Sequence, residues 1–203
     1  MPEPFRTRSF VAVDAALRPV RTRAAVRVIV TDGDSVLLLS DTDPGAPGSG
    51  WWTTPGGGID PGELPLQAAV RELAEETGLV VGPDRLAGPM LRRFVVHGYS
   101  DQVLGQSELF YLLRVPEPFE LDVSGFTDEE KLTIASWAWL PIAELTDAVQ
   151  PVWPVDLAEL LALAERADDW PVDAGVVEES TVNAGELTGR AVVGWTGPDS
   201  EVE

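Results

Sequence analysis

The sequence contains no cysteine and only one histidine, His97. Disulfide bonds and thiolate metal sites are therefore excluded, and a zinc site, which usually needs several Cys or His ligands, is not expected. Basic residues are scarce as well: 14 Lys and Arg stand against 34 Asp and Glu, for a formal net charge of −20. Such a charge repels polyanions at long range, so we expect no nucleic-acid partner.

Long hydrophobic runs are also missing. No window approaches the roughly 20 apolar residues that a membrane helix requires, and residues 1–17 lack the apolar core of a signal peptide. We therefore expect a cytoplasmic protein without a membrane partner. A length of 203 residues suits one domain, with or without an appendage.

The most informative segment that is present, residues 57–79, reads GGIDPGELPLQAAVRELAEETGL. Pro65 suits the first turn of a helix, and we expect a helix over 65–77. Apolar residues recur there at the offsets of one helical stripe, which predicts a face packed on a core: Leu66, Ala69, Val70, Leu73 and Thr77. Glu72, Glu75 and Glu76, at i, i+3 and i+4, are expected on a face turned away from that stripe.

Two interpretations of this acidic face follow from the residues. Like charges at this spacing cost only about 0.2–0.5 kcal/mol per pair, so an ordinary solvated helix surface is one of them. The other is a metal site, because carboxylate oxygens are the ligands that Mg²⁺ or Mn²⁺ prefers, and such ions bridge to substrate phosphates. The preceding residues 55–58, PGGG, favour the metal site, since glycine lets the backbone approach a ligand closely.

Residues 57–79 also match every fixed position of the Nudix box, G-x5-E-x7-R-E-U-x-E-E-x-G-U, with Leu73 and Leu79 at the aliphatic U positions. The chain therefore resembles the Nudix hydrolases. The resemblance implies an α/β fold, an α/β/α sandwich around a central mixed sheet. It also implies Mg²⁺, or alternatively Mn²⁺, and hydrolysis of a diphosphate linkage in a nucleoside diphosphate derivative.

The resemblance carries over to individual residues. It implies that the metal ligands are Glu72, Glu75 and Glu76, helped by the carbonyl of Gly56. Glu63 and Arg71 would form an orienting ion pair, although Arg71 is also within one helical turn of Glu75 and could pair there instead. Leu64 stands where Ser or Thr would cap the helix, and losing such a cap typically costs about 1 kcal/mol.

A second acidic stretch, FTDEEK at 126–131, precedes the run WAWL at 137–140. Many Nudix enzymes carry a further glutamate at this place as a metal ligand or general base, and we expect Glu130 in that role, with Glu129 as the neighbour it could be confused with. A helix-capping role for this acid is equally open. Glu72 or Glu130 could be the base, because clustered carboxylates titrate as a set. His97 is a weaker candidate, since a lone strand histidine is more often structural.

Four residues are expected to contact the substrate: Arg23, Trp52, Gly57 and Gly58. Arg23 belongs to the N-terminal part, which is the most basic region of the chain. Trp52 is a candidate for stacking on a nucleobase. Because strand residues alternate sides, only one of Trp51 and Trp52 can face a given side of the sheet.

The choice of substrate depends on loops outside the box. Nudix ADP-ribose hydrolases often carry a proline about fifteen residues past the box, and Phe94 stands there instead. By elimination we expect a nucleoside triphosphate or modified dNTP pyrophosphohydrolase. ADP-ribose or a nucleotide sugar is an alternative substrate, and a non-catalytic nucleotide-sensing domain is an alternative of another class. An isoprenoid diphosphate isomerase would need a catalytic cysteine.

The remaining pattern predicts the rest of the domain. Runs at 24–31 and 36–39, joined by the turn DGD, predict a hairpin, and further strands are expected at 51–54, 92–99, 108–115 and 137–140. A helical turn is expected at 141–145, and a longer helix from Leu157, Leu160, Leu161 and Ala164. We assign 21–167 to the Nudix domain and 1–20 to an N-terminal extension or edge strand. Residues 168–203 form an acidic extension, either with an extra strand at 192–195 or partly disordered. Both a monomer and a homodimer are compatible with the residues.

Overall fold

The computed structural model describes residues 8–163, 165–185, 189 and 191. Its strands are β1 (Val20–Thr31), β2 (Ser35–Asp41), β3 (Trp51–Thr53), β4 (Ala87–Gly98), β5 (Val103–Arg114), β6 (Ser136–Pro141), β7 (Val152–Trp153) and β8 (Val172–Glu178). The α-helices are α1 (Pro65–Thr77), α2 (Glu130–Thr133) and α3 (Leu157–Leu163). Short 3-10 turns are η1 (Ala15–Leu17), η2 (Pro83–Arg85), η3 (Val123–Gly125), η4 (Ile142–Asp147) and η5 (Ala167–Asp169).

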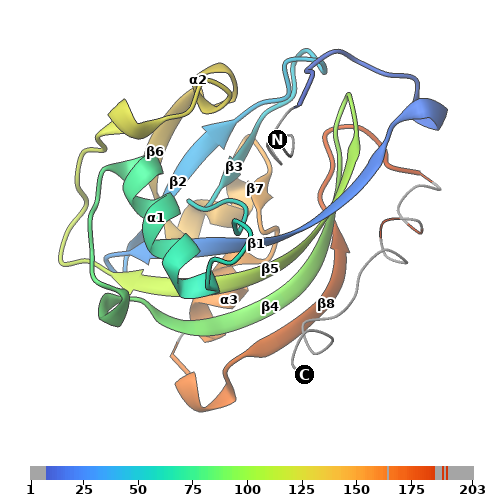
Figure 1. Ribbon diagram of the computed structural model, residues 1–203. Helices are drawn as coiled ribbons and strands as arrows, with labels where there is room; N and C mark the ends of the chain where they lie inside the picture. Colours follow the sequence, from blue (N-terminus) through green and yellow to red (C-terminus); the bar gives the residue numbers. More distant parts are fainter. Residues whose placement is uncertain (1–7, 164, 186–188, 190, 192–203) are drawn as a thin grey trace.

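The strands form one curled, mixed sheet in the order β7-β3-β2-β1-β5-β4-β8, with β6 paired to β2 outside this path (Figure 1). β1 runs parallel to β5, β3 to β7 and β4 to β8, whereas the β4–β5 and β2–β6 pairs are antiparallel. The expectation of a mixed sheet is therefore confirmed.

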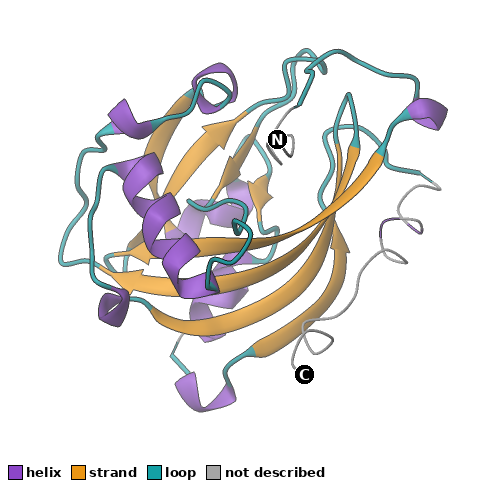
Figure 2. Cartoon of the chain, in the orientation of Figure 1, coloured by secondary structure: helices purple, strands orange, loops and turns teal. Residues whose placement is uncertain are grey.

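Helices cover both faces of this sheet (Figure 2). On one face α1 packs Ala69 and Leu73 against β-strand residues such as Val28. On the other, α3 packs Leu157 against a separate cluster that includes the next residue of β1, Ile29. Adjacent residues of β1 thus serve opposite cores, as the alternation of side chains along a strand requires. The predicted α/β/α layering is confirmed.

The expected hairpin between the first two strands is only partly present. Its turn forms as predicted, with Asp32 Oδ1 accepting hydrogen bonds from the backbone N–H groups of Asp34 and Ser35. Beyond it, β1 and β2 pair at a single position, Thr31 with Val36. The strands then separate, because β1 pairs along its whole length with β5 and β2 pairs with β6. This separation makes room for the loop that precedes α1.

The C-terminal extension contributes a strand that the local sequence pattern does not predict. β8 lies within 168–203 and adds a parallel edge to β4. The strand suggested at 192–195, and Ala164 of the expected helix, lie outside the described residues. Among the described residues, no helix is long and apolar enough to cross a membrane.

Candidate functional site

A cavity of about 490 Å³ opens between the sheet, α1 and α2. Its lining comes from the N-terminal segment, β1, β2, Thr53 of β3, the glycine loop at 56–58, α1, the β4–β5 turn with the start of β5 (99–104), and the α2 region at 127–134. Glu72, Glu76 and Glu130 all reach it, so the structure gathers the two acidic stretches of the sequence into one site.

Helix α1 begins and ends where the sequence predicts. Pro65 occupies its first turn, and Gly78 ends it in the left-handed conformation at φ 73°. Leu64 at the N-cap offers no side-chain acceptor. Instead Gln67 Oε1 accepts a hydrogen bond from the Leu64 backbone N–H at 3.0 Å, which satisfies one N–H group at the start of the helix.

Of the two interpretations of the α1 carboxylates, the ordinary solvated surface is wrong for two of the three residues. Glu72 is 0% exposed and Glu76 is 5% exposed. Their face of the helix is covered by the glycine loop, against which the Glu76 carboxylate accepts a hydrogen bond from the Gly56 N–H at 2.6 Å. A Cβ added at Gly57 would lie 2.6 Å from Glu72 Oε1. Buried carboxylates are unfavourable unless they are paired or bind a cation, so an ordinary surface role is excluded for these two.

Glu72, Glu76 and Glu130 form a compact set of hard oxygen donors. One carboxylate oxygen from each lies within 4.8 Å of the others. Burial, then repulsion from Glu72 and Glu130, raises the pKa of Glu76 well above its ordinary value. A bound divalent cation would compensate the buried negative charge and the repulsion among the three carboxylates. Carboxylate oxygens are also the ligands that Mg²⁺ or Mn²⁺ requires. The residues present therefore fit such an ion.

Glu130 makes the capping contacts that one interpretation requires and lies beside Glu72 and Glu76, as the other requires. Its Oε2 accepts hydrogen bonds of 2.7 Å from the backbone N–H and the hydroxyl of Thr127, three residues earlier, which is a capping arrangement. The same side chain completes the acidic set with α1. Glu129 also lines the cavity.

Arg71 forms both of the ion pairs that its spacing allowed. Its Nε and Nη2 donate to the two carboxylate oxygens of Glu63 at 2.9 and 2.8 Å. Its Nη1 donates to Glu72 at 2.8 Å and to Glu75 at 3.2 Å. Hydrogen bonds to Glu63 are the largest cause of the raised pKa of Arg71. Glu75 therefore faces Arg71, with its side chain 37% exposed, and does not belong to the three-carboxylate set.

The glycine loop is pinned onto β1. Val26 and Val28 donate backbone hydrogen bonds to Gly57 and Pro55 at 2.9 and 2.8 Å. Gly56 has a φ of 140°, and a Cβ there would collide with the carbonyl of Val26, so only glycine fits. The Gly56 carbonyl, expected as a metal ligand, accepts a hydrogen bond from Arg27 Nη1 at 3.2 Å.

Behind this loop lies a buried charge network that sequence reasoning missed. Arg27 Nε donates to Glu108 at 3.1 Å, and Arg93 Nε donates to the other oxygen of Glu108 at 2.8 Å. Arg93 also makes a bidentate pair with Glu179, both hydrogen bonds being 2.8 Å long. Burial alone would raise the pKa of Glu108, but Arg93 and Arg27 lower it to about 2. The network links the segment after β8 to the glycine loop that covers Glu72 and Glu76.

A signal for part of this network is present in the sequence. Arg27 interrupts an apolar strand, and Arg93 and Glu108 lie within runs expected as strands. A lone charge in such a run is either on a solvated face or paired inside the protein. No local pattern marks Glu179, which reaches Arg93 from 86 residues away.

The expected substrate-contacting residues divide into two groups. Arg23, Gly57 and Gly58 line the cavity, and Arg23 Nε donates to Gln106. Trp52 does not line it but packs against the hydrophobic cluster under α3. Its neighbour Trp51 points to the other side, where its ring stacks on Trp153 at 4.7 Å. The structure therefore brings neither tryptophan to the cavity.

His97 lies away from the cavity as well. It is 2% exposed, and its Nδ1 lies 2.7 Å from the carbonyl oxygen of Glu179. Burial lowers the pKa of His97 to about 3, so it stays neutral at physiological pH. These contacts suit a structural histidine.

The chain is similar to known proteins over most of its length. The family model for the NUDIX domain matches residues 21–164. A relative named RNA pyrophosphohydrolase from Psychrobacter arcticus is 33% identical over 151 residues, covering 68% of this chain and 84% of that relative. One with the same name from Rhodopseudomonas palustris is 33% identical over 127 residues, covering 57% of this chain and 73% of the relative. A solved MutT protein from Bacillus halodurans aligns with a TM-score of 0.48 at 20% identity, covering 68% of this chain and 80% of that one.

Proposed function

We infer the function of this chain from one premise: it belongs to the Nudix hydrolase superfamily, whose domain model spans residues 21–164. The chain is a Nudix pyrophosphohydrolase, an enzyme that hydrolyses phosphoric anhydride bonds. What remains to be proposed is the substrate, the metal and the role of each residue at the site.

We propose that the substrate is a nucleoside 5′-triphosphate, free or as a modified dNTP, and that Mg²⁺ is the cofactor, with Mn²⁺ able to replace it. The observation that carries this proposal is the buried set Glu72, Glu76 and Glu130, which opens into a cavity of about 490 Å³. A cavity of a few hundred Å³ is the size that encloses a single small ligand. Arg21 and Arg23 line the same cavity and supply positive charge for further phosphate oxygens.

The metal would be held by Glu72, Glu76 and Glu130. When bound, it would neutralise charge that develops on the phosphoryl oxygens. The other two expected ligands, Glu75 and the carbonyl of Gly56, each accept a hydrogen bond from an arginine, Arg71 and Arg27 respectively. Each has further lone pairs that could bind the cation.

The protein residues provide the remaining chemistry. Water that attacks phosphorus must lose a proton, and Glu72 or Glu130 is positioned to accept it. Arg71, fixed by the fork of contacts to Glu63, orients Glu72. Gly57 and Gly58 present backbone rather than side chains to the cavity, which leaves room for phosphate groups.

A second candidate substrate is RNA, because the curated relatives at 33% identity are named RNA pyrophosphohydrolases. Internal RNA linkages are phosphodiesters, so an anhydride-cleaving enzyme can act only on a polyphosphate at the chain end. The net charge of −20 weighs against an extended polyanion. The absence of a nucleic-acid partner stays a prediction.

ADP-ribose and nucleotide sugars have less support as substrates. They also contain a diphosphate, but no described contact favours them over a triphosphate. A non-catalytic sensor would not need three carboxylates within 4.8 Å of one another. The following experiment distinguishes these cases from triphosphate hydrolysis. Cytoplasmic localisation remains a prediction from the sequence, which leaves a monomer and a homodimer open.

The test is a panel of NTPs, oxidised dNTPs, ADP-ribose, nucleotide sugars and 5′-triphosphorylated oligonucleotides, each with Mg²⁺ and with EDTA. All products are separated by anion-exchange chromatography for the wild type and for Glu76→Gln, because ADP-ribose and nucleotide sugars yield two monophosphates whereas a triphosphate releases phosphate or pyrophosphate. We expect metal-dependent turnover of nucleoside triphosphates that the variant lacks. Exclusive turnover of ADP-ribose or a nucleotide sugar would refute the triphosphate assignment, and full activity in EDTA would refute the metal.

A further inference from the structure

A short N-terminal segment, residues 8–13, enters the cavity from outside the part of the chain that the NUDIX model matches, which starts at residue 21. Arg8 and Phe10 of this segment line the same cavity as Glu72 and Glu76. The segment therefore adds to the site of this particular chain something that the family match does not include.

Asp101 fixes the segment in place. One of its carboxylate oxygens accepts hydrogen bonds from Arg8 Nε and Nη2 at 3.1 and 2.8 Å. The other accepts from the backbone N–H groups of Ser9 and Phe10 at 2.8 and 3.1 Å. A little further along, the Val13 N–H donates to the carbonyl of Ser100 at 2.8 Å. The segment is thus held against the turn that joins β4 to β5.

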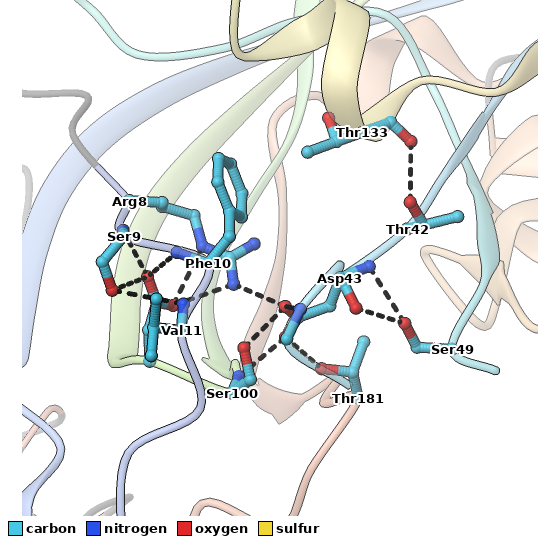
Figure 3. Close-up of polar contacts among 12 residues, drawn as sticks. Arg8, Ser9, Phe10, Val11, Thr42, Asp43, Ser49, Ser100, Thr133 and Thr181 are labelled. Atoms are coloured by element: carbon cyan, nitrogen blue, oxygen red, sulfur yellow. Dashed lines mark hydrogen bonds and ion pairs between the residues drawn. The ribbon is translucent and has the colours of Figure 1, made fainter. Parts of the chain in front are cut away.

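Asp43, a second buried carboxylate, holds the same segment from another side. It lies 3.0 Å from Arg8 Nη2, and it accepts hydrogen bonds of 2.7 Å from the N–H and the hydroxyl of Ser100 (Figure 3). Thr181 donates to it at 3.2 Å. Gly45, two residues on, packs so closely that an added Cβ would lie 2.8 Å from the Phe10 carbonyl. Three other parts of the chain, at 43–45, at 100–101 and at Thr181, therefore fix the position of Arg8 and Phe10.

This arrangement holds Phe10 in an uncommon conformation. Its φ is 53°, and no other described non-glycine residue has a positive φ. The left-handed conformation is unfavourable for a residue that carries a side chain. In this conformation the successive N–H groups of Ser9 and Phe10 both point toward the same carboxylate oxygen of Asp101. Strain of this kind persists where the surroundings enforce it, and at a cavity wall it points to a function.

Arg8 lies over two aromatic rings, and all three groups line the cavity. The Arg8 guanidinium carbon lies 4.8 Å from the Phe10 ring centroid and 4.0 Å from that of Tyr99. Its positive charge is already compensated by Asp43 and Asp101. Arg8 is therefore poorly suited to attract a phosphate, whereas stacked guanidinium and aromatic groups are suited to a nucleobase.

We propose that Arg8 and Phe10 form a specificity-determining wall of the cavity, against which the base of a single nucleotide stacks while its phosphates reach the three carboxylates. This inference rests on the proposed function. We expect it to favour a free nucleotide over a triphosphorylated RNA end, because the wall offers a stacking place for one base beside a cavity of about 490 Å³. The net charge of −20 acts in the same direction.

The decisive variant is Phe10→Asn. Asparagine tolerates the left-handed conformation, so the backbone of the segment can persist while the ring is lost. We expect KM for a nucleoside triphosphate to rise about tenfold or more, in line with the loss of one base–aromatic stack, with a smaller change in kcat. Phe10→Tyr keeps a ring and should restore the wild-type KM. Val11→Ala is the matched control, because Val11 is 67% exposed and does not line the cavity. An unchanged KM in Phe10→Asn would overturn the proposal.

Selectivity for a single nucleotide is tested with a free NTP and a 5′-triphosphorylated oligonucleotide of the same first base. We expect the wild type to favour the NTP by at least about tenfold in kcat/KM, and Asp101→Asn, which weakens the pinning, to narrow this ratio. An oligonucleotide that is the better wild-type substrate would contradict the single-nucleotide wall.

A binding measurement separates this inference from the proposed function. Binding of a nucleoside 5′-monophosphate in EDTA requires neither metal nor hydrolysis. An NMR titration that follows chemical-shift changes gives its Kd. If the wild type hydrolyses no triphosphate but binds the monophosphate more tightly than Phe10→Asn does, the proposed function is refuted and base stacking on Phe10 is supported. If the wild type hydrolyses triphosphates and both proteins bind the monophosphate equally tightly, base stacking on Phe10 is refuted and the proposed function is supported.

Discussion

Replacing Glu76 with glutamine should inactivate the enzyme and at the same time stabilise its metal-free fold. Glu76 is buried, and oxygens of Glu72 and Glu130 lie within 4.8 Å of its carboxylate. At an effective dielectric constant of about 20, two unit charges at that distance repel each other by about 3 kcal/mol. The raised pKa of Glu76, caused by burial and then by these neighbours, reflects the same unfavourable energy.

The substitution removes this charge and keeps the volume and one oxygen, which can still accept the Gly56 N–H. Because Arg27 and proton uptake already offset part of the repulsion, we expect a gain of about 1–3 kcal/mol in the free energy of unfolding in EDTA. For a chain of this length each kcal/mol raises Tm by about 2–4 °C. Calorimetry in EDTA at neutral pH measures the gain.

In excess Mg²⁺ the wild type should become more stable than Glu76→Gln, the reverse of their order of stability in EDTA. A ligand at about one hundred times its Kd stabilises the native state by about 2.7 kcal/mol. The wild type should gain this stabilisation and Glu76→Gln should lose most of it. Glu159→Gln, the same chemical change on an exposed position of α3, is the control and should follow the wild type in both conditions. A variant that is less stable than the wild type in EDTA, or that gains as much from Mg²⁺, would refute the reasoning.

Three further predictions concern the frame around the carboxylates. Glu108→Gln leaves two buried arginines without their shared anion and should destabilise the protein by about 3–5 kcal/mol in urea unfolding. Because the two arginines outweigh burial and depress the folded pKa of Glu108 to about 2, from an ordinary 4.5, its contribution is present above pH 5 and lost as pH falls toward 2. That loss, about 3 kcal/mol, should be missing from the variant's pH profile. Gly56→Ala introduces both a strained φ and a collision, so turnover should fall by orders of magnitude together with Tm; a normal Tm and kcat would contradict the loop geometry. Arg71→Lys loses the two-pronged contact to Glu63, and a Mg²⁺ titration of activity should shift to higher concentration, with an unshifted midpoint counting against the orienting role.

The parts of the structure that could be predicted are those specified by local patterns. Pro65, the apolar stripe and Gly78 fix the two ends of α1 and the face it packs, and the structure has the helix at the expected residues. Most of the strands are likewise predicted from apolar runs, which are local patterns too. Boundaries moved where pairing partners, rather than local sequence, set the strand length, as in β4, which begins at Ala87 rather than at 92.

Burial of the α1 glutamates could not be read from the helix itself. Periodicity places Glu72 and Glu76 on a common face, but the cover over that face comes from the loop at 56–58 and from α2. Both lie on other parts of the chain. The same limit applies to Glu179, and to Arg8, whose partner Asp101 is 93 residues away. Such contacts form only once the sheet has brought distant residues together, so no local sequence pattern predicts them.

Trp52 shows a different limit. The sequence could say that only one of two adjacent tryptophans faces a given side, but not which side carries the site. In the structure Trp52 belongs to the core under α3 and Trp51 to an aromatic stack with Trp153. The aromatic residues that do line the cavity are Phe10 and Tyr99, and both are brought there by the Asp43 and Asp101 contacts.

Joint coordination of the catalytic cation by Glu72, Glu76 and Glu130 is the central claim to test. The most direct measurement is anomalous scattering from crystals soaked in MnCl₂, because Mn²⁺ gives a signal that water and Mg²⁺ do not. We predict a peak within about 2.0–2.6 Å of a carboxylate oxygen from each of the three glutamates. We also predict that the peak vanishes in crystals of Glu76→Gln. A peak coordinated by Glu63 and Glu75 instead, or one that survives the substitution unchanged, would contradict the claim.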